Sequence, residues 1–465
     1  RRLYENKTLL DYVGETTAQD SADGLAALLH REEKRQFETI GLIASENVVS
    51  PMAACLEGSV FTNKNTEGYA GKRFVGGCEL ADQAELLAVE RVKKAFGVDH
   101  ANIQCGNATI ANVAVLRAFL KPGDTFLGLA LDNGGHLSHG AKFHYSGATY
   151  NALHYGVSRE TEMIDMDQVR QMALEHKPKL ICVGSSSYPR LIDYKAFREI
   201  CDEVGAYFWV DCAHDCGLIA GGAIPSPVPY AHVITFSTQK TLRGPRGCGV
   251  ILVCKDMEIP DGVKKDGTPK FTKLSTKIDR SVFPRLQGGP KGDMLAARGV
   301  LFYELLQPEF KEYAKQVCRN AKALAKGCAD EGMRIITGGT DTHMVMIDVT
   351  PLGVNGLEAE TLLNNLGLVT NKNMIPYDQL PPSCGSGLRI GSPTMTTRGA
   401  KEEEMEHIGH LLGQALKNRD NQAVLDEIAA EVKQIATSHP MFSSEWVSPC
   451  IREQFEDMYC HPSFQ

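Results

Sequence analysis

The middle of the chain alternates short apolar runs with longer amphipathic segments. Between about residues 80 and 290, apolar runs of strand length lie at 125–131, 179–184, 207–211, 232–236 and 249–254. Helical spacing of apolar residues occurs at 80–96, 167–176 and 194–204. Uninterrupted apolar strands that alternate with amphipathic helices are typical of a mostly parallel sheet covered on both faces. We therefore expect a large α/β domain in this part of the chain.

The two ends of the chain follow other patterns. Residues 1–50 are predicted to form an N-terminal arm with a charged amphipathic helix over 22–38. Helices are expected at 293–306, 313–331, 357–366, 401–417 and 421–436, with short apolar runs at 334–337 and 343–349. This predicts a large domain over 51–300 and an α+β C-terminal domain over 301–465. The polar stretch 255–277 is expected to be a surface loop.

Composition narrows the class of protein. The 465 residues are 43% hydrophobic and 23% charged, which is ordinary for a soluble globular protein. A net charge of −8 leaves no basic excess for nucleic acid or anionic lipid, and no apolar run is long enough to span a membrane. The 14 cysteines are scattered without metal-ligand spacing, so we expect reduced structural thiols, no metal and a cytoplasmic protein. The sequence leaves open whether a targeting segment upstream of Arg1 has been removed.

Lys240 follows an apolar run and precedes a turn rich in glycine and proline. Sites in open α/β sheets form at the carboxyl ends of strands, and a desolvated amine there can lose its charge and form an imine. Asp211 and His214 close the preceding apolar run. An acidic partner for a pyridine nitrogen and an imine-forming lysine are what pyridoxal 5'-phosphate (PLP) chemistry requires. The two segments together favour a PLP site.

Eight motifs follow one another along the chain: L-I-A-S-E-N (42–47), E-G-Y-x-G-K-R (67–73), G-G-H-L-S-H-G (134–140), D-x-A-H (211–214), K-T-L-R-G-P-R-G (240–247), Q-G-G-P (287–290), N-K-N (371–373) and S-G-L-R-I-G (386–391). Motifs of this kind occur in the same order in serine hydroxymethyltransferases, a family that the chain resembles over roughly residues 20–420. The resemblance implies the aminotransferase-like fold of fold-type I PLP enzymes. It also implies a homodimer or tetramer whose sites use both subunits. The implied reaction cleaves the Cα–Cβ bond of serine and passes the one-carbon unit to tetrahydrofolate.

The resemblance also implies roles for individual residues around the cofactor. Lys240 would form the Schiff base, Asp211 would pair with the pyridine nitrogen, and His136 would stack on the ring. His214 and Ser186 would lie near the phenolic oxygen of the ring. Further cofactor contacts are expected from Ser237, Gln239, Asn107, Ala108 and Thr109.

On the substrate side, Arg389 would bind the amino-acid carboxylate, because a guanidinium can hold a carboxylate through two hydrogen bonds. Glu67 would be the acid/base carboxyl near the transferred hydroxymethyl group. Leu137 and Asn371, with Glu67, match positions that lie by the folate in the family. Further contacts to the substrate are expected from Ser45, Asn65 and Tyr69.

Several positions depart from the family pattern near the cofactor. The phosphate-binding Ser-Gly-Ser is Asn107-Ala108-Thr109 here, and the histidine before the lysine is Gln239. A helix N-terminus at Asn107 would still favour an anion. The usual Gly-Gly before Gln287 is Arg285-Leu286, which makes backbone approach to a partner's phosphate harder.

Two further departures concern the substrate. Tyrosines of the family are replaced by Asn65 and Val75, which opens space and removes two hydroxyl groups. An α-substituted serine such as α-methylserine is therefore an alternative substrate, since a methyl group changes discrimination by about 1–3 kcal/mol. A folate-independent aldolase or transaldolase is a second alternative, and a catalytically impaired homologue acting as a scaffold is a third.

Overall fold

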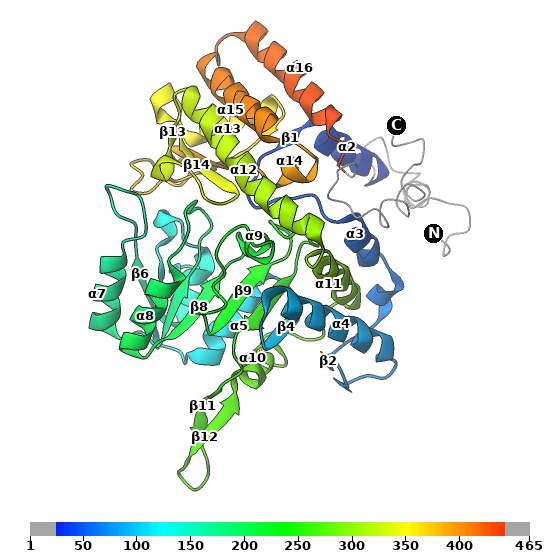
Figure 1. Cartoon of the computed structure of the whole chain (residues 1–465), viewed down its shortest axis with the longest axis vertical. Helices are drawn as coiled ribbons and strands as arrows, with labels where there is room; N and C mark the ends of the chain where they lie inside the picture. Colours follow the sequence, from blue (N-terminus) through cyan, green and yellow to red (C-terminus); the bar gives the residue numbers. More distant parts are fainter. Residues whose placement is uncertain (1–24, 442–465) are drawn as a thin grey trace.

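The structure is a computed structural model that describes residues 25–441. A large lobe lies below a smaller C-terminal lobe in Figure 1. The large lobe is built on a seven-stranded sheet in the order β4 (His100–Cys105), β10 (Gly249–Val253), β9 (Val233–Ser237), β8 (Tyr207–Asp211), β7 (Leu180–Val183), β5 (Thr125–Leu129) and β6 (Asn151–Tyr155). Neighbouring strands from β9 to β6 are parallel, and β10 is antiparallel to both of its neighbours. The predicted α/β class and mostly parallel sheet are confirmed.

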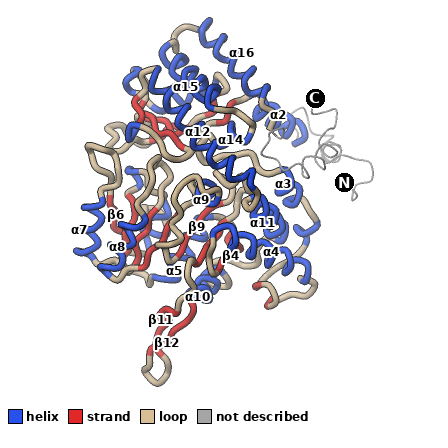
Figure 2. Tube along the Cα trace, viewed as in Figure 1, coloured by secondary structure: helices blue, strands red, loops and turns tan. Residues whose placement is uncertain are grey.

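Helices cover both faces of this sheet, as Figure 2 shows. Alternate residues of β7 point to opposite faces: Ile181 and Val183 belong to one buried cluster, and Leu180 and Cys182 to another. The first cluster contains side chains of α4 (Glu79–Phe96), α7 (Met166–His176), α8 (Tyr194–Val204), α9 (Cys216–Ala220) and α11 (Gly292–Glu304). The second contains side chains of α5 (Ala108–Phe119) and α10 (Leu274–Val282). The apolar strands predicted from the sequence are therefore buried on both sides.

The C-terminal lobe packs helices against a small antiparallel sheet. Its strands run in the order β13 (Arg334–Ile335), β14 (Met344–Asp348), β17 (Gly387–Gly391) and β16 (Asn371–Asn373). Its helices are α12 (Pro308–Asp330), α13 (Gly356–Asn365), α14 (Pro393–Thr397), α15 (Glu402–Lys417) and α16 (Gln422–Ser438). This agrees with the predicted α+β pattern. The domain limits stay predictions, and side chains of α12 belong to the cores of both lobes.

The N-terminal arm joins the C-terminal lobe. The predicted helix over 22–38 is α2 (Leu25–Glu38) in the described part of the chain, and residues 1–24 lie outside the described residues. The short strand β1 (Ile40–Gly41) pairs in parallel with β15 (Leu368–Val369), and Ile40 and Leu42 are buried in the core of that lobe. The large lobe also contains α3 (Pro51–Glu57), β2 (Gly68–Tyr69), β3 (Lys72–Arg73) and α6 (Tyr145–Thr149).

The prediction of a loop over 255–277 is wrong, because this segment contains strands and the start of a helix. The segment forms a hairpin of β11 (Glu258–Val263) and β12 (Pro269–Lys273), and α10 begins at Leu274. The hairpin projects from the bottom of the large lobe (Figures 1 and 2). Ile259 is the one buried residue of its two strands, so both faces of the hairpin are exposed to solvent and the sequence shows no alternation of buried and exposed residues.

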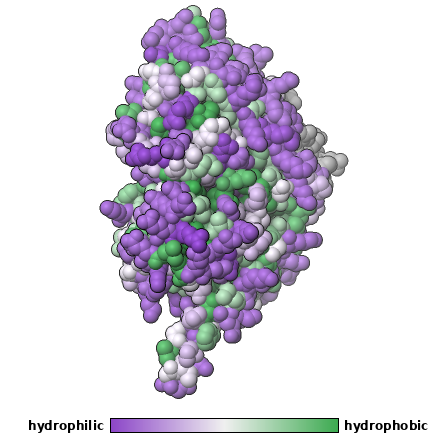
Figure 3. Space-filling view, turned by 60° about the vertical axis from the view of Figure 1, so that its left-hand side comes forward, coloured by the Kyte–Doolittle hydropathy of each residue, from purple (hydrophilic) through white to green (hydrophobic). Residues whose placement is uncertain are grey.

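The outside of the molecule is mostly polar. In Figure 3, hydrophilic residues cover most of the visible face, and hydrophobic residues gather mainly across its middle. Among the described residues, no helix combines the length and the hydrophobicity that a membrane span requires. Nine of the twelve cysteines in the described part of the chain are buried.

Candidate active site

A cavity of about 150 Å³ opens at the carboxyl ends of β8 and β9, where ligands bind in open α/β sheets. Its walls come from these strand ends, the start of α5, the loop after β7 and the segment before β6. The lining residues are Asn107, Ala108, Thr109, Asn112, His136, Ser185, Ser186, Asp211, Ala213, His214, Ser237, Gln239 and Lys240. The ten residues predicted to contact the cofactor all lie in this wall.

Lys240 lies just beyond β9 with its amine inside the wall. Its Nζ donates a hydrogen bond to Ser237 Oγ at 3.1 Å, and the side-chain amide of Asn47 donates to the Lys240 carbonyl at 2.8 Å. Burial lowers the pKa of the Lys240 amine, an effect that the nearby Asp211 partly opposes. A lysine with a lowered pKa supplies the free amine that imine formation needs.

Asp211 ends β8 on the floor of the cavity. Its Oδ2 accepts hydrogen bonds from Asn112 Nδ2 at 2.7 Å and from His139 Nε2 at 2.9 Å, and its Oδ1 accepts one from the Ala213 amide at 3.0 Å. Burial alone would raise the pKa of this carboxyl. The hydrogen bond from His139 and the neighbouring positive charges outweigh burial, so the Asp211 pKa lies below its ordinary value. An ionised carboxylate therefore faces the cavity.

His136 precedes a single 3-10 turn over Leu137–His139. Its Nδ1 lies 2.6 Å from Ser138 Oγ and accepts a hydrogen bond from the Ser138 amide at 3.2 Å. Burial lowers the pKa of His136 to about 4, so the ring is neutral at pH 7. These contacts fix the orientation of a flat, uncharged ring in the cavity wall.

The N-terminus of α5 forms another part of the cavity wall. Asn107 is the N-cap, and its Oδ1 accepts a hydrogen bond from the Ile110 amide at 2.9 Å. A helix N-terminus presents unpaired N–H groups and a positive dipole end to an anion. The exchange of serine for asparagine thus keeps the cap. Arg285 is exposed, and Gln287 Oε1 accepts a hydrogen bond from the Gly106 amide at 3.1 Å.

The cavity fits PLP in the chemistry of its walls. It holds an amine with a lowered pKa, an ionised carboxylate that can pair with a protonated pyridine nitrogen, and a helix N-terminus for a phosphate. Two buried oxygens in its wall, Gln239 Oε1 and Asn112 Oδ1, have no hydrogen-bond partner among the described residues. Buried polar atoms without partners are costly, so a polar ligand accounts for them.

Arg389 lies on β17, beside the wall of this cavity. Its Nη1 donates a hydrogen bond to the Ser186 carbonyl at 2.8 Å, and its Nε has no partner within the described chain. Burial lowers the pKa of this guanidinium. A buried cation that lacks a carboxylate partner is suited to bind a carboxylate of a ligand.

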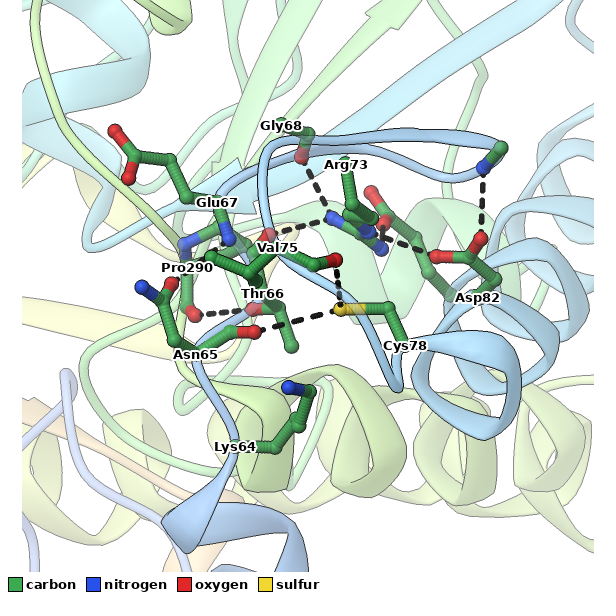
Figure 4. Close-up of polar contacts among 12 residues, drawn as sticks. Lys64, Asn65, Thr66, Glu67, Gly68, Arg73, Val75, Cys78, Asp82 and Pro290 are labelled. Carbon is green, nitrogen blue, oxygen red and sulfur yellow. Dashed lines mark hydrogen bonds and ion pairs between the residues drawn. The ribbon is translucent and has the colours of Figure 1, made fainter.

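The other residues predicted on the substrate side do not line the cavity of their own chain. Ser45 follows β1, and Asn65, Glu67 and Tyr69 belong to the segment around β2. The Glu67 carboxylate extends away from the polar cluster that holds its backbone (Figure 4). Asn65 Oδ1 accepts from the Glu67 amide at 3.0 Å, and Tyr69 OH donates to the Asp279 carbonyl at 2.7 Å.

Sequence reasoning did not assign roles to His139 and Asn112, the two side chains that hold Asp211. A role for His139 could have been predicted, because it lies in the same motif as His136 and follows it by three residues. Asn112 lies in the interior of α5, one turn beyond Ala108, and only the packing of α5 on the sheet brings it to Asp211.

The sheet, the buried lysine after β9 and the carboxylate at the end of β8 define a fold-type I PLP-dependent enzyme. A family model described as "Serine hydroxymethyltransferase" matches residues 18–412. The chain therefore belongs to the serine hydroxymethyltransferase family. It is a PLP-dependent hydroxymethyltransferase that uses tetrahydrofolate as its co-substrate, as that family does.

Bacterial relatives named serine hydroxymethyltransferase match along most of the chain. The protein from Coprothermobacter proteolyticus is 49% identical over 415 residues, which are 89% of this chain and 95% of the relative. The protein from Koribacter versatilis is 48% identical over 418 residues, 90% of this chain and 94% of the relative. The protein from Acidobacterium capsulatum is 47% identical over 432 residues, 93% of this chain and 97% of the relative.

Proposed function

We propose that the cavity around Lys240 is where this enzyme interconverts serine and glycine. PLP, when bound, supplies an electron sink for the electrons of the broken Cα–Cβ bond. The observation that carries the proposal is the pairing, in one cavity, of a lysine with a lowered pKa and a carboxylate with a lowered pKa. The first supplies the amine, and the second keeps a pyridine nitrogen protonated.

Two other groups orient the amino acid in this proposal. The unpaired Nε of Arg389 and its second amino group can hold the substrate carboxylate, which fixes the Cα bonds relative to the cofactor ring. His136 would stack on the cofactor ring as a neutral surface and restrict its rotation. Both groups are partly buried and hydrogen-bonded within the chain, so their geometry is set before the substrate arrives.

We also propose that Glu67 acts in the cavity of a second copy of the chain. Its carboxylate lies outside its own cavity and has no intrachain hydrogen bond in the described structure. Large apolar side chains of the same region are exposed: Phe74 by 72%, Leu80 by 68% and Val60 by 58%. Exposed apolar side chains grouped in this way are typical of a subunit interface. A homodimer would cover them and bring Glu67 to the neighbouring cavity.

A complementation experiment tests this arrangement. Lys240→Ala and Glu67→Gln are each expected to abolish serine cleavage as homodimers. If the sites are shared between subunits, a hybrid of the two variants contains one cavity with both native residues. Mixing and refolding them together should therefore restore activity. No restoration, in a mixture shown to contain hybrids, would place Glu67 and Lys240 in the same subunit's site.

The choice of amino acid rests on Asn65 and Val75. Asn65 Oδ1 accepts a hydrogen bond from the Glu67 amide. An asparagine at this position lacks the hydroxyl group of the tyrosine that the family has there. The three bacterial relatives are named serine hydroxymethyltransferase, which favours serine as the substrate. We expect kcat/KM with tetrahydrofolate to be higher for L-serine than for α-methylserine. The opposite order would support an α-substituted substrate, and equal cleavage without tetrahydrofolate would support a folate-independent aldolase.

A further inference from the structure

Two buried side chains lie behind His214 and take no part in the proposed reaction. His343 directly precedes β14 and is fully buried, and Asp215 follows His214 in the chain, with 14% of its side chain exposed. Neither of them lines the Lys240 cavity, whereas His214 does. His343 contacts His214 directly and Asp215 faces His343, so any role of the two residues in the site would be exerted through His214.

The contacts of His343 determine which nitrogen of His214 carries a proton. His343 Nε2 lies 3.2 Å from the Ala44 carbonyl oxygen and 3.2 Å from His214 Nδ1. A carbonyl oxygen can only accept, so His343 Nε2 must carry the proton of that contact. A nitrogen that carries a proton cannot accept one from His214. His214 Nδ1 is therefore the acceptor.

Both rings are neutral, which completes the assignment. Burial, followed by the nearby Arg389, lowers the pKa of His343 to about 3. Burial and the charge of Lys240 hold the pKa of His214 well below its ordinary value. Each ring then has a single proton. In His214 that proton is on Nε2, and in His343 Nδ1 is bare.

The bare nitrogen of His343 faces Asp215. His343 Nδ1 lies 3.8 Å from Asp215 Oδ1, and neither atom has a hydrogen-bond partner in the described part of the chain. Burial, and then the charge of Asp211, raises the pKa of Asp215 to about 7. The two atoms are too far apart for a hydrogen bond in this structure. On closer approach, the acid form of Asp215 would donate to His343 Nδ1 and keep that nitrogen an acceptor.

We propose that Asp215 and His343 are positioning residues that hold His214 in its Nε2–H form. The inference rests on the proposed function, because a fixed N–H donor in the cavity wall would point to an oxygen acceptor of the cofactor or substrate. Histidines in sites are commonly oriented by the hydrogen bond of their other ring nitrogen. Here that hydrogen bond comes from a second histidine.

The protonation form can be observed without cofactor or substrate. Long-range ¹H–¹⁵N correlation spectra of the ¹⁵N-histidine-labelled full chain distinguish protonated from bare ring nitrogens. The signals of His214 are those lost in His214→Asn. We expect a bare Nδ1 and a protonated Nε2 in the native protein at pH 7, and nitrogen shifts averaged between the two forms in His343→Phe.

Matched variants separate the role of His343 from general damage. His343→Asn supplies an amide donor to the Ala44 carbonyl and His214, and should keep the native pattern. Asp215→Asn supplies an amide donor to His343 Nδ1 and should also keep it, whereas Asp215→Leu should move the His214 shifts toward the average. His232→Asn removes a partly buried histidine of the large lobe, which accepts a hydrogen bond from the Phe208 amide, and should leave His214 unchanged.

Two results would overturn the proposal. One is a native His214 with its proton on Nδ1. The other is a single Nε2–H form that persists in His343→Phe, or in Asp215→Leu should the first variant not fold. Because the spectra need neither PLP nor serine, they do not depend on the substrate. Failure of serine cleavage in the native enzyme would instead contradict the proposed function.

Discussion

The charge state of Asp211 depends on individual neighbours. A buried carboxylate is costly unless it is hydrogen-bonded, and Asp211 receives hydrogen bonds from Asn112, His139 and the Ala213 amide. These donors keep it ionised at neutral pH in spite of its burial. The strength of the site as a PLP pocket therefore rests on residues that do not themselves react.

Asp211→Asn is expected to lower kcat for serine by about 100-fold or more, since a neutral amide cannot stabilise a protonated pyridine nitrogen. Steady-state assays at saturating PLP measure this effect. His139→Gln, which keeps a donor to Asp211, should lose much less activity. Equal losses in the two variants would mean that the charge on Asp211 is not what matters.

Site residues could be predicted from the sequence where they lie at, or just beyond, the end of an apolar strand. Lys240 and Asp211 each close an apolar run, so their positions are visible in the sequence. His343 and Asp215 were not assigned, because His343 reaches His214 from the C-terminal lobe and Asp215 faces His343 rather than the cavity. Contacts across 129 residues leave no local pattern in the sequence.

At the level of elements, the β2–β3 hairpin that carries Glu67 is held by one buried arginine. Arg73 Nη1 donates to the carbonyls of Thr66 at 2.7 Å and Gly68 at 2.6 Å, and its Nε donates to Asp82 at 2.7 Å. Its Nη2 pairs with Glu85, which is 5% exposed. Figure 4 shows this guanidinium between the hairpin and α4. The position of Glu67 therefore depends on a buried ion pair.

Arg73→Met should lower the free energy of unfolding by about 3 kcal/mol, because it leaves Glu85 buried without its cation. Denaturation with urea measures the loss. The double variant Arg73→Met/Glu85→Leu should recover a large part of it, since no charge then stays buried. A single variant as stable as the native protein would show that the pair does not hold the hairpin.

Strands of the large sheet could be predicted from the sequence where both of their faces are apolar. The five predicted strands of the large sheet are present, within two residues at their ends. Strands β4 and β6 were missed because polar residues interrupt them, such as Asn102 and Gln104 on β4 and His154 on β6. The side chains of Asn102 and Gln104 form hydrogen bonds with Asp279 and Glu85, partners that a sequence pattern does not contain.

For the whole molecule, buried neutral histidines make stability depend on pH. Burial, and then the charge of Arg198, lowers the pKa of His232 from 6.5 to about 4. Between these values the unfolded chain binds a proton that the folded chain does not, so acid favours unfolding. The free energy of unfolding should fall by up to about 1.4 kcal/mol per pH unit for such a group as the pH drops from 6.5 to 4.

His232→Asn should remove this share of the slope, because Asn Oδ1 can accept from the Phe208 amide in place of Nδ1 but does not titrate. Urea denaturation of both proteins at several pH values between 4.5 and 6.5 measures the slope. An unchanged slope in the variant would contradict the account of His232 as a buried neutral ring.

The central claim is that the whole fold serves one PLP site with Lys240 as its amine. The most direct test is the visible absorption spectrum of the purified protein with PLP, recorded before and after addition of glycine, with and without tetrahydrofolate. We predict a visible band that is absent in Lys240→Ala, and a new band with glycine that strengthens when tetrahydrofolate is present. A protein that retains no PLP, or a spectrum that is the same in Lys240→Ala, would contradict the account.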